Sequence, residues 1–303
     1  MNYTPYYFSD ISKEYEIEYL KFNNYIYKKD LSYTKNDCKS IILLFNFEGK
    51  NILRGYRDGI MFPQINYFNI ENIHIKKKET KLQEIFEYII KIYDEYNIVD
   101  SKIYQDPYLC FKLGYSIFNL IDTKNFNIES NMHLCINYSE NVNIENIECE
   151  MEGGGTRTII NGFKKNPPTI KIYFGEIENE IFQSFVNKHY ELAGKKTKSE
   201  NCWDLNKEMI LNKEAILVVY ENNYVLFHSS ENYSYYGINA CTKGDKIVTY
   251  LLYEGIKWLT KNGYKFIHFD IFHKYSIGEK NINISKFKKS FCNKIYTQYY
   301  VYK

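Results

Sequence analysis

The chain has 303 residues, of which 45% are hydrophobic and 25% charged, and this length suits about two domains that each bury a core. Its 39 basic residues stand against 37 acidic ones, so the formal net charge is only +2. So small a net charge produces no strong overall field for nucleic acid, which argues against a DNA-binding protein.

The first residues of the sequence and the distribution of its cysteines indicate the cellular compartment. The first ten residues, MNYTPYYFSD, lack the basic start and apolar core of a secretory signal, and no run of about 18 apolar residues could span a bilayer. The seven cysteines are scattered and none forms a CxxC pair, which argues against a zinc site or a disulfide framework. We therefore expect a cytoplasmic protein with no integral membrane segment, no metal site and no tightly bound cofactor.

The first half of the chain has the pattern of a hairpin, a helix and a strand. The apolar run 41–47 and a second strand from Asn51 flank a turn at 48–50. Apolar residues at helical spacing follow in 81–97, and 101–106 has the composition of a strand. The apolar face of the predicted helix consists of Leu82, Ile85, Phe86, Ile89 and Tyr93.

Glycines and prolines mark the middle of the chain. Residues 153–155 are three glycines, Thr156 is a candidate N-cap, and a short helix with an apolar face precedes the two adjacent prolines at 167–168. No Gly-Lys-Ser/Thr follows the glycines, so we interpret them as a hinge and not as a phosphate-binding loop. We place the domain boundary here, with domains at 1–165 and 166–303.

The second half repeats the order hairpin, helix, strand. Strands at 215–220 and 224–229 flank a turn at 221–223, an amphipathic helix covers 245–263, and 264–272 has the pattern of a strand. The two halves share few residue identities, so the repeat rests on order and spacing. Antiparallel hairpins mixed with helices that return to the sheet predict an α/β fold with mixed sheets and flanking helices, built from two similar tandem units.

Three segments carry a family resemblance. They are GGTRTIINGFKKNPPTIKIYF at 154–174, NGYKFIHFD ending at Asp270, and ISKFKKSF at 284–291. Their succession resembles the Fem-type acyltransferases, the branch of the GNAT superfamily that includes the aminoacyl-tRNA-dependent enzymes building peptidoglycan cross-bridges. The resemblance spans residues 40–300 and implies two tandem GNAT-like domains, the first of them degenerate and the second carrying the transferase site.

Two departures from the family pattern are visible. The family pattern ends in Phe-Gly where this chain has Phe291 and Cys292, and the Gln/Arg-x-x-Gly-x-Gly/Ala loop of acetyl-CoA-dependent GNATs is absent. In its place stands ACTKGDK, which makes Lys243 and Gly244 the donor-binding candidates and puts Asp245 where its carboxylate would cap the next helix. The resemblance therefore favours an aminoacyl-tRNA donor, with acyl-CoA as the alternative.

The stretch GKKTKSENCW at 194–203 is the main substrate-binding candidate. In a GNAT-like fold this loop borders the acceptor cleft, and acceptors of the family carry phosphate or carboxylate. Charges, hydroxyl donors and an aromatic wall for such groups would come from Lys196, Thr197, Lys198, Ser199 and Trp203. The alternative is a solvated loop that only caps the helix starting near Asp204.

His268 and Asp270 are the catalytic candidates. They alternate along a predicted strand, so their side chains are expected on one face, where they could deprotonate an attacking amine. A structural hydrogen-bonded pair at a strand end is the alternative interpretation.

Three further side chains are candidates for the substrate site. Tyr236 lies on a predicted central strand, where it would either line the cleft or pack in the core. Lys286 and Lys288 lie on the last predicted helix and would neutralise acceptor phosphates. That helix would also be anchored to the core by Phe287 and Phe291 at a spacing of i and i+4.

Together these features predict an acyl- or aminoacyltransferase that forms an amide on an amine of a cell-wall or surface-polysaccharide precursor. The acceptor would be an anionic small molecule such as a nucleotide-linked sugar or muramyl peptide, and tRNA would be a partner where it carries the donor. Two alternatives stay open: an acyl-CoA-dependent N-acetyltransferase acting on a nucleotide sugar, and a non-catalytic GNAT-like binding protein. No nucleophile motif is visible, so catalysis would depend on positioning, which can supply ~7–11 kcal/mol.

Overall fold

The protein divides into two compact units. The structure is a computed structural model, and it describes residues 9–35, 38–55, 64–67, 75–99, 102–105, 110, 113–123, 126–137, 142–230, 233–242, 244–264, 266–271 and 278–302. Unit 1 comprises Met1–Asn131 together with Tyr296–Lys303, and unit 2 comprises Met132–Ile295. The boundary that the sequence suggests, between residues 165 and 166, lies inside unit 2.

Unit 1 contains a small antiparallel sheet. Its strands, in spatial order, are β1 (Ile26–Asp30), β4 (Leu43–Phe47) and β5 (Lys50–Arg54). The last two form the predicted hairpin, and the turn residues Glu48 and Gly49 both have positive φ, as a tight two-residue hairpin turn requires. Helix α1 (Asp10–Phe22) contributes Ile17 and Leu20 to the apolar core of this sheet.

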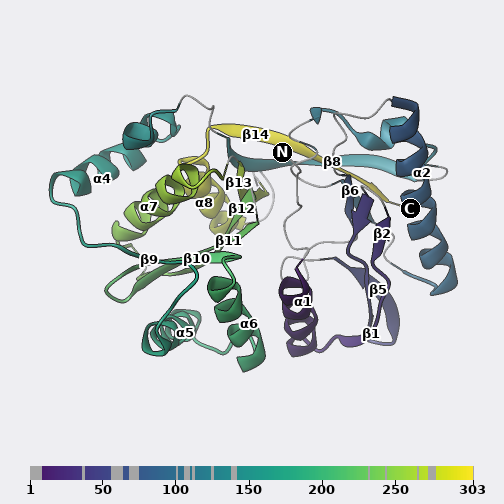
Figure 1. Cartoon of the computed structure of the whole chain (residues 1–303), viewed down its shortest axis with the longest axis horizontal. Helices are drawn as coiled ribbons and strands as arrows, with labels where there is room; N and C mark the ends of the chain where they lie inside the picture. The colour runs from purple at the N-terminus through teal and green to yellow at the C-terminus, as the bar shows by residue number, and fades with distance from the viewer. Residues whose placement is uncertain are drawn as a thin grey trace. The chain divides into compact units, whose positions relative to one another are not determined.

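Unit 1 also contains a second group of strands and the long helix α2 (Ile75–Glu95), whose apolar core includes Ile103 and Val301 of two of these strands (Figure 1). These strands are β2 (Tyr33–Lys35), β3 (Cys38–Ser40), β6 (Gln64–Tyr67), β7 (Ile103–Gln105), β14 (Lys294–Tyr302) and the start of β8 (Asn127–Asn137). The five apolar residues predicted for one face of α2 are all buried, which confirms the helical periodicity. The short 3-10 helix η2 (Ile117–Leu120) also packs in this core. Val301 of β14 pairs with Ile103 and is fully buried, so the last strand of the chain helps to build unit 1.

Unit 2 is built on a mixed sheet. Its strands, in spatial order, are the end of β8, β13 (Phe266–Ile271), β12 (Tyr233–Ala240), β11 (Asn223–Ser230), β10 (Ala215–Tyr220) and β9 (Lys171–Tyr173). Strands β12 and β13 run parallel, and the other described neighbours run antiparallel. The predicted hairpin of the second half is the pair β10–β11, and the mixed sheet agrees with the predicted fold class.

Helices cover both faces of the unit 2 sheet. They are η3 (Ile144–Glu150), α4 (Gly154–Lys165), α5 (Asn179–Ala193), α6 (Glu200–Leu211), α7 (Ile247–Lys261) and α8 (Gly278–Lys289). In Figure 1, α4, α7 and α8 lie on one face, and α5 and α6 lie on the other. Helix α7 lies close to the sheet at Gly255, where an added Cβ would be 2.5 Å from the Phe227 ring.

Two structural absences apply only to the described part of the chain. There, no helix combines the length and the apolarity needed to cross a bilayer. No group of three or more His, Cys, Asp or Glu side chains in those residues is arranged to hold a metal ion.

Candidate functional site

Two cavities in unit 2 lie at the predicted site residues. The first, which we call the α5–α6 cavity, has a volume of about 640 Å³ and lies between those two helices. The second, the β12–α7 cavity, has a volume of about 360 Å³ and lies where β12 ends and α7 begins. Within the described part of the chain they have no lining residue in common.

The loop between α5 and α6 is held by caps at both ends. Helix α5 ends at Gly194, whose φ of +68° is the left-handed conformation of a glycine C-cap and whose N–H donates to the Tyr190 carbonyl oxygen. Helix α6 begins after Ser199, whose hydroxyl accepts a hydrogen bond from the Cys202 N–H at 3.2 Å. Ser199 is therefore an N-cap, as the alternative interpretation of this loop anticipates.

Side chains of α5 also hold the loop. The Trp203 indole N–H donates to the Tyr190 hydroxyl at 2.7 Å, and that hydroxyl donates to the Lys198 carbonyl oxygen at 2.9 Å. Thr197 Oγ1 lies 2.8 Å from His189 Nε2, and Lys198 is only 5% exposed. These contacts give the predicted residues structural roles. Of the loop candidates, Lys196 and Trp203 also line the α5–α6 cavity.

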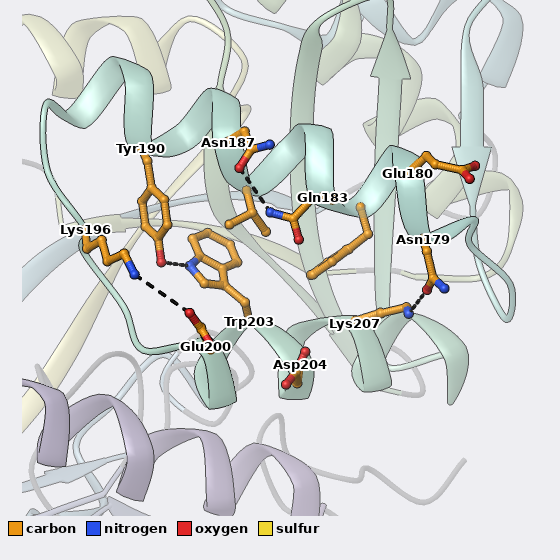
Figure 2. A pocket seen from close by; sticks show the side chains of 12 residues that line it. Asn179, Glu180, Gln183, Asn187, Tyr190, Lys196, Glu200, Trp203, Asp204 and Lys207 are labelled. Atoms are coloured by element: carbon orange, nitrogen blue, oxygen red, sulfur yellow. Dashed lines mark hydrogen bonds and ion pairs between the residues drawn. The ribbon is translucent and has the colours of Figure 1, made fainter.

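Charged side chains of both signs line the α5–α6 cavity (Figure 2). The Lys196 ammonium lies 3.8 Å from the Glu200 carboxylate, and Lys207 Nζ donates to the Asn179 side-chain oxygen. Carboxylates come from Glu180, Glu200 and Asp204. Lys207, Asp204 and Glu180 could not be predicted as lining residues, because nothing in their local sequence pattern shows that α5 and α6 enclose a cavity.

The β12–α7 cavity lies beside the predicted donor-binding turn. Gly244 lines it and has a φ of +84°, while Lys243 lies outside the described residues. The Asp245 carboxylate accepts a hydrogen bond from the Ile247 N–H at 2.9 Å, so it occupies a donor at the start of α7, as the sequence suggests. The remaining lining residues are Ile159, Asn239, Cys241, Thr242, Lys246, Val248, Thr249 and Phe287.

The thiol in this cavity is not a nucleophile at neutral pH. Cys241 is buried, and burial raises its pKa to about 12. A thiol with such a pKa stays protonated near pH 7, and the thiolate is the reactive form.

Strands β12 and β13 separate near this cavity. Their parallel pairing runs from Tyr233 opposite Phe266 to Tyr235 opposite His268. Strand β12 then continues to Ala240 while β13 pairs with β8 on its other side. The described pairing therefore leaves the last part of β12 without β13 beside it.

Tyr236 lies at the start of this opening. Its ring is buried, with its centroid 5.4 Å from that of Phe269, and the Lys288 ammonium lies 5.8 Å from the ring centroid. The structure thus brings together two predicted substrate residues, Tyr236 and Lys288, from β12 and α8. Phe287 and Phe291 contact each other edge to face and anchor α8 as predicted.

The catalytic candidates lie on β13. His268 is fully buried, and its Nε2 lies 3.0 Å from Nδ1 of His133, a partner on β8 that no local sequence pattern predicts. The register of β13 on β8 shifts between His268 and Asp270. The Asp270 side chain lies outside the described residues, and Lys286 is exposed on α8.

Comparisons with known proteins identify the fold. No protein-family model matches the sequence, and no curated protein matches it. The alignment with the crystal structure of FemX covers 97% of this chain and 92% of the FemX chain, with a TM-score of 0.64 at 12% identity. The alignment with L-PGS from Bacillus licheniformis covers 99% of this chain and 94% of the L-PGS chain, with a TM-score of 0.56 at 10% identity.

A third similar structure is the C-terminal domain of a putative lysylphosphatidylglycerol synthetase from Agrobacterium fabrum. It covers 97% of this chain and 89% of its own, with a TM-score of 0.55 at 8% identity. Identities this low show the fold alone. The chain therefore has the fold of FemX and L-PGS, an α/β fold with mixed sheets and flanking helices, as the sequence resemblance to Fem-type proteins predicts.

Proposed function

We propose that the chain is a cytoplasmic acyl- or aminoacyltransferase that forms an amide on an amine of a cell-wall or surface-polysaccharide precursor. The fold supports this class of chemistry, because FemX and a putative lysylphosphatidylglycerol synthetase share it over nearly the whole chain. The second name denotes attachment of a lysyl group to a phospholipid, which is an acyl transfer.

The observation that carries the proposal is the separation of β12 from β13 beside the β12–α7 cavity. A strand edge without a neighbour leaves backbone N–H groups that can donate to the carbonyl oxygen of a bound acyl ester or thioester. The carboxyl ends of strands are also where open α/β sheets bind their ligands.

In the proposed reaction, the lone pair of the acceptor amine attacks the acyl carbonyl carbon. The carbonyl oxygen takes up negative charge beside the N–H groups of β12, and the C–O or C–S bond to the donor then breaks. The nitrogen loses one proton and the leaving alcohol or thiol gains one. Burial raises the pKa of Tyr236, so near neutral pH its phenol can donate a hydrogen bond but not accept the amine proton. A role for His268 and Asp270 in moving that proton stays a prediction.

The start of α7 favours an aminoacyl-tRNA donor over acyl-CoA. The Asp245 carboxylate occupies the Ile247 N–H and adds negative charge where a pyrophosphate would otherwise bind a helix N-terminus. An acyl-CoA-dependent N-acetyltransferase acting on a nucleotide sugar is the second candidate, and a non-catalytic binding protein the third.

Ligand-induced thermal shifts separate these candidates. We expect stabilisation by a nucleotide-linked muramyl peptide and none by acetyl-CoA alone. Stabilisation by acetyl-CoA alone would instead select the acetyltransferase. No stabilisation by any of these ligands, combined with capture of a protein partner, would contradict the proposed transferase.

A further inference from the structure

The charges of the α5–α6 cavity do not match a site for an anion. Among the described residues, its lining holds the carboxylates of Glu180, Glu200 and Asp204 and the ammonium groups of Lys196 and Lys207, so carboxylates outnumber cations by three to two. A site for phosphate would have an excess of cations. The mixture of signs instead suits a ligand that itself carries both charges.

The two ammonium groups of the cavity are weakly held: Lys196 by an exposed ion pair and Lys207 by a neutral amide. The Lys196–Glu200 pair is 3.8 Å apart with side chains 68% and 88% exposed, and pairs of this kind contribute about 0–1 kcal/mol. Lys207 donates to a neutral amide, that of Asn179. A carboxylate of a ligand could therefore approach Lys207 without displacing another anion.

The Asp204 carboxylate is available to a cation. Among the described residues no hydrogen bond or ion pair reaches it, and Figure 2 draws it without one. Asp204 and Lys207 are three residues apart on α6, where Cβ atoms are about 5–6 Å apart, yet they do not pair with each other. This spacing presents one negative and one positive group side by side on the same helix.

The rest of the lining suits an apolar side chain. Phe182, Val186 and Trp203 form an apolar part of the wall, and Trp203 is held in place by its hydrogen bond to Tyr190. A wall fixed in this way loses little conformational freedom when a ligand binds. A volume of about 640 Å³ is also within the range of small-molecule sites.

We propose that the α5–α6 cavity binds a free α-amino acid with a large apolar side chain. Its ammonium group pairs with Asp204, its carboxylate, one carbon away, pairs with Lys207, and its side chain lies against Phe182 and Val186. This site is separate from the β12–α7 cavity and does not depend on the proposed transfer reaction. Asp204 and Lys207, which carry opposite charges three residues apart on α6, select a zwitterion over an anion.

Isothermal titration calorimetry with L-leucine and L-phenylalanine tests the proposal on the full chain. We expect both to bind, whereas N-acetyl-L-leucine, which lacks the ammonium group, and isoamylamine, which lacks the carboxylate, should bind at least about tenfold more weakly. No heat with either amino acid at millimolar concentration, or an affinity for either analogue equal to that for L-leucine, would overturn the proposal.

Matched variants on one helix locate the site. Asp204→Asn should weaken L-leucine binding about tenfold or more, because it removes the charge that pairs with the ammonium group. Glu208→Gln makes the same charge change at an exposed position one turn further along α6 and should leave the affinity within about twofold. Equal affinities for both variants, with both folded by circular dichroism, would contradict the assigned site. Since none of these measurements involves turnover, they succeed or fail independently of transferase activity.

Discussion

At the scale of single residues, two lysines of one loop lie in opposite environments. The Lys196 side chain is 68% exposed on the α5–α6 cavity, whereas Lys198 is 5% exposed and its carbonyl oxygen is bound by Tyr190. The charge pattern of the sequence makes them equivalent. The hydrogen bonds from α5 make them different, and we expect their substitution to have different effects.

Lys198→Ala should lower the free energy of unfolding by about 1–3 kcal/mol, because it removes a buried side chain. Lys196→Ala should change it by no more than about 0.5 kcal/mol, as is usual for an exposed side chain. Urea unfolding of the two variants measures both values. Equal losses of stability would show that the burial of Lys198 does not stabilise the loop.

Asp245 gives a second residue-scale prediction. Asp245→Asn keeps a side-chain oxygen that can cap α7 but removes a negative charge from the β12–α7 cavity. A unit charge at about 4 Å in water is worth ~1 kcal/mol, so affinity for coenzyme A should rise severalfold while the melting temperature stays nearly constant. Titration calorimetry with coenzyme A measures this affinity. An unchanged affinity would show that the Asp245 charge is not what weakens coenzyme A binding.

At the scale of elements, the packing of α7 depends on one glycine. A Cβ on Gly255 would lie 2.5 Å from the Phe227 ring and 3.2 Å from a Val218 methyl group, so the helix or the sheet would have to shift. Gly162, inside α4, has no atom within 4 Å of such a Cβ. Substitutions at these two glycines therefore separate the effect of packing from the effect of helix propensity.

Gly255→Ala should lower the free energy of unfolding by about 1–3 kcal/mol, because overpacking outweighs the gain in helix propensity. Gly162→Ala should raise it by up to about 1 kcal/mol, since only the propensity changes. Denaturant unfolding compares them directly. A stabilising Gly255→Ala would show that α7 is not in close contact with β11 at that position.

The elements themselves could be predicted from sequence, because their signals are local. The hairpins β4–β5 and β10–β11 and the buried face of α2 follow from periodicity and turn residues. The contact between His133 and His268 joins residues 135 positions apart, and the α5–α6 cavity depends on how two helices pack. No local pattern carries such information, so the carboxylates of that cavity were missed.

At the scale of the whole molecule, unit 1 combines the first part of the sequence with its last strand. The sequence-based boundary followed the glycines and prolines around α4, but Ile160 of that helix is buried in the core of unit 2. Strand β14 leaves unit 2 and completes the strands of unit 1, where Gln298 Nε2 donates to the Gln105 carbonyl oxygen at 3.0 Å. A strand from the far end of the chain cannot be assigned to the first unit from spacing alone.

Val301→Ala should therefore destabilise unit 1 more than unit 2. Val301 is fully buried in the core shared with α2, so its truncation should cost about 1–3 kcal/mol there. Hydrogen exchange should speed up in α2 and β7 and stay unchanged in α7 and β11. Lys294→Ala, an exposed change on the same strand, is the control. Equal acceleration in both units would contradict the assignment of β14 to unit 1.

Mass spectrometry of a defined acceptor tests the central claim most directly. The protein is incubated with a nucleotide-linked muramyl peptide or amino sugar, together with either charged tRNA or acetyl-CoA. We predict that the acceptor gains one acyl or aminoacyl group through a bond that resists hydroxylamine, as an amide does and an ester does not. An unmodified acceptor in every combination, with the protein shown to be folded, would contradict the assignment of this chain as an amide-forming transferase.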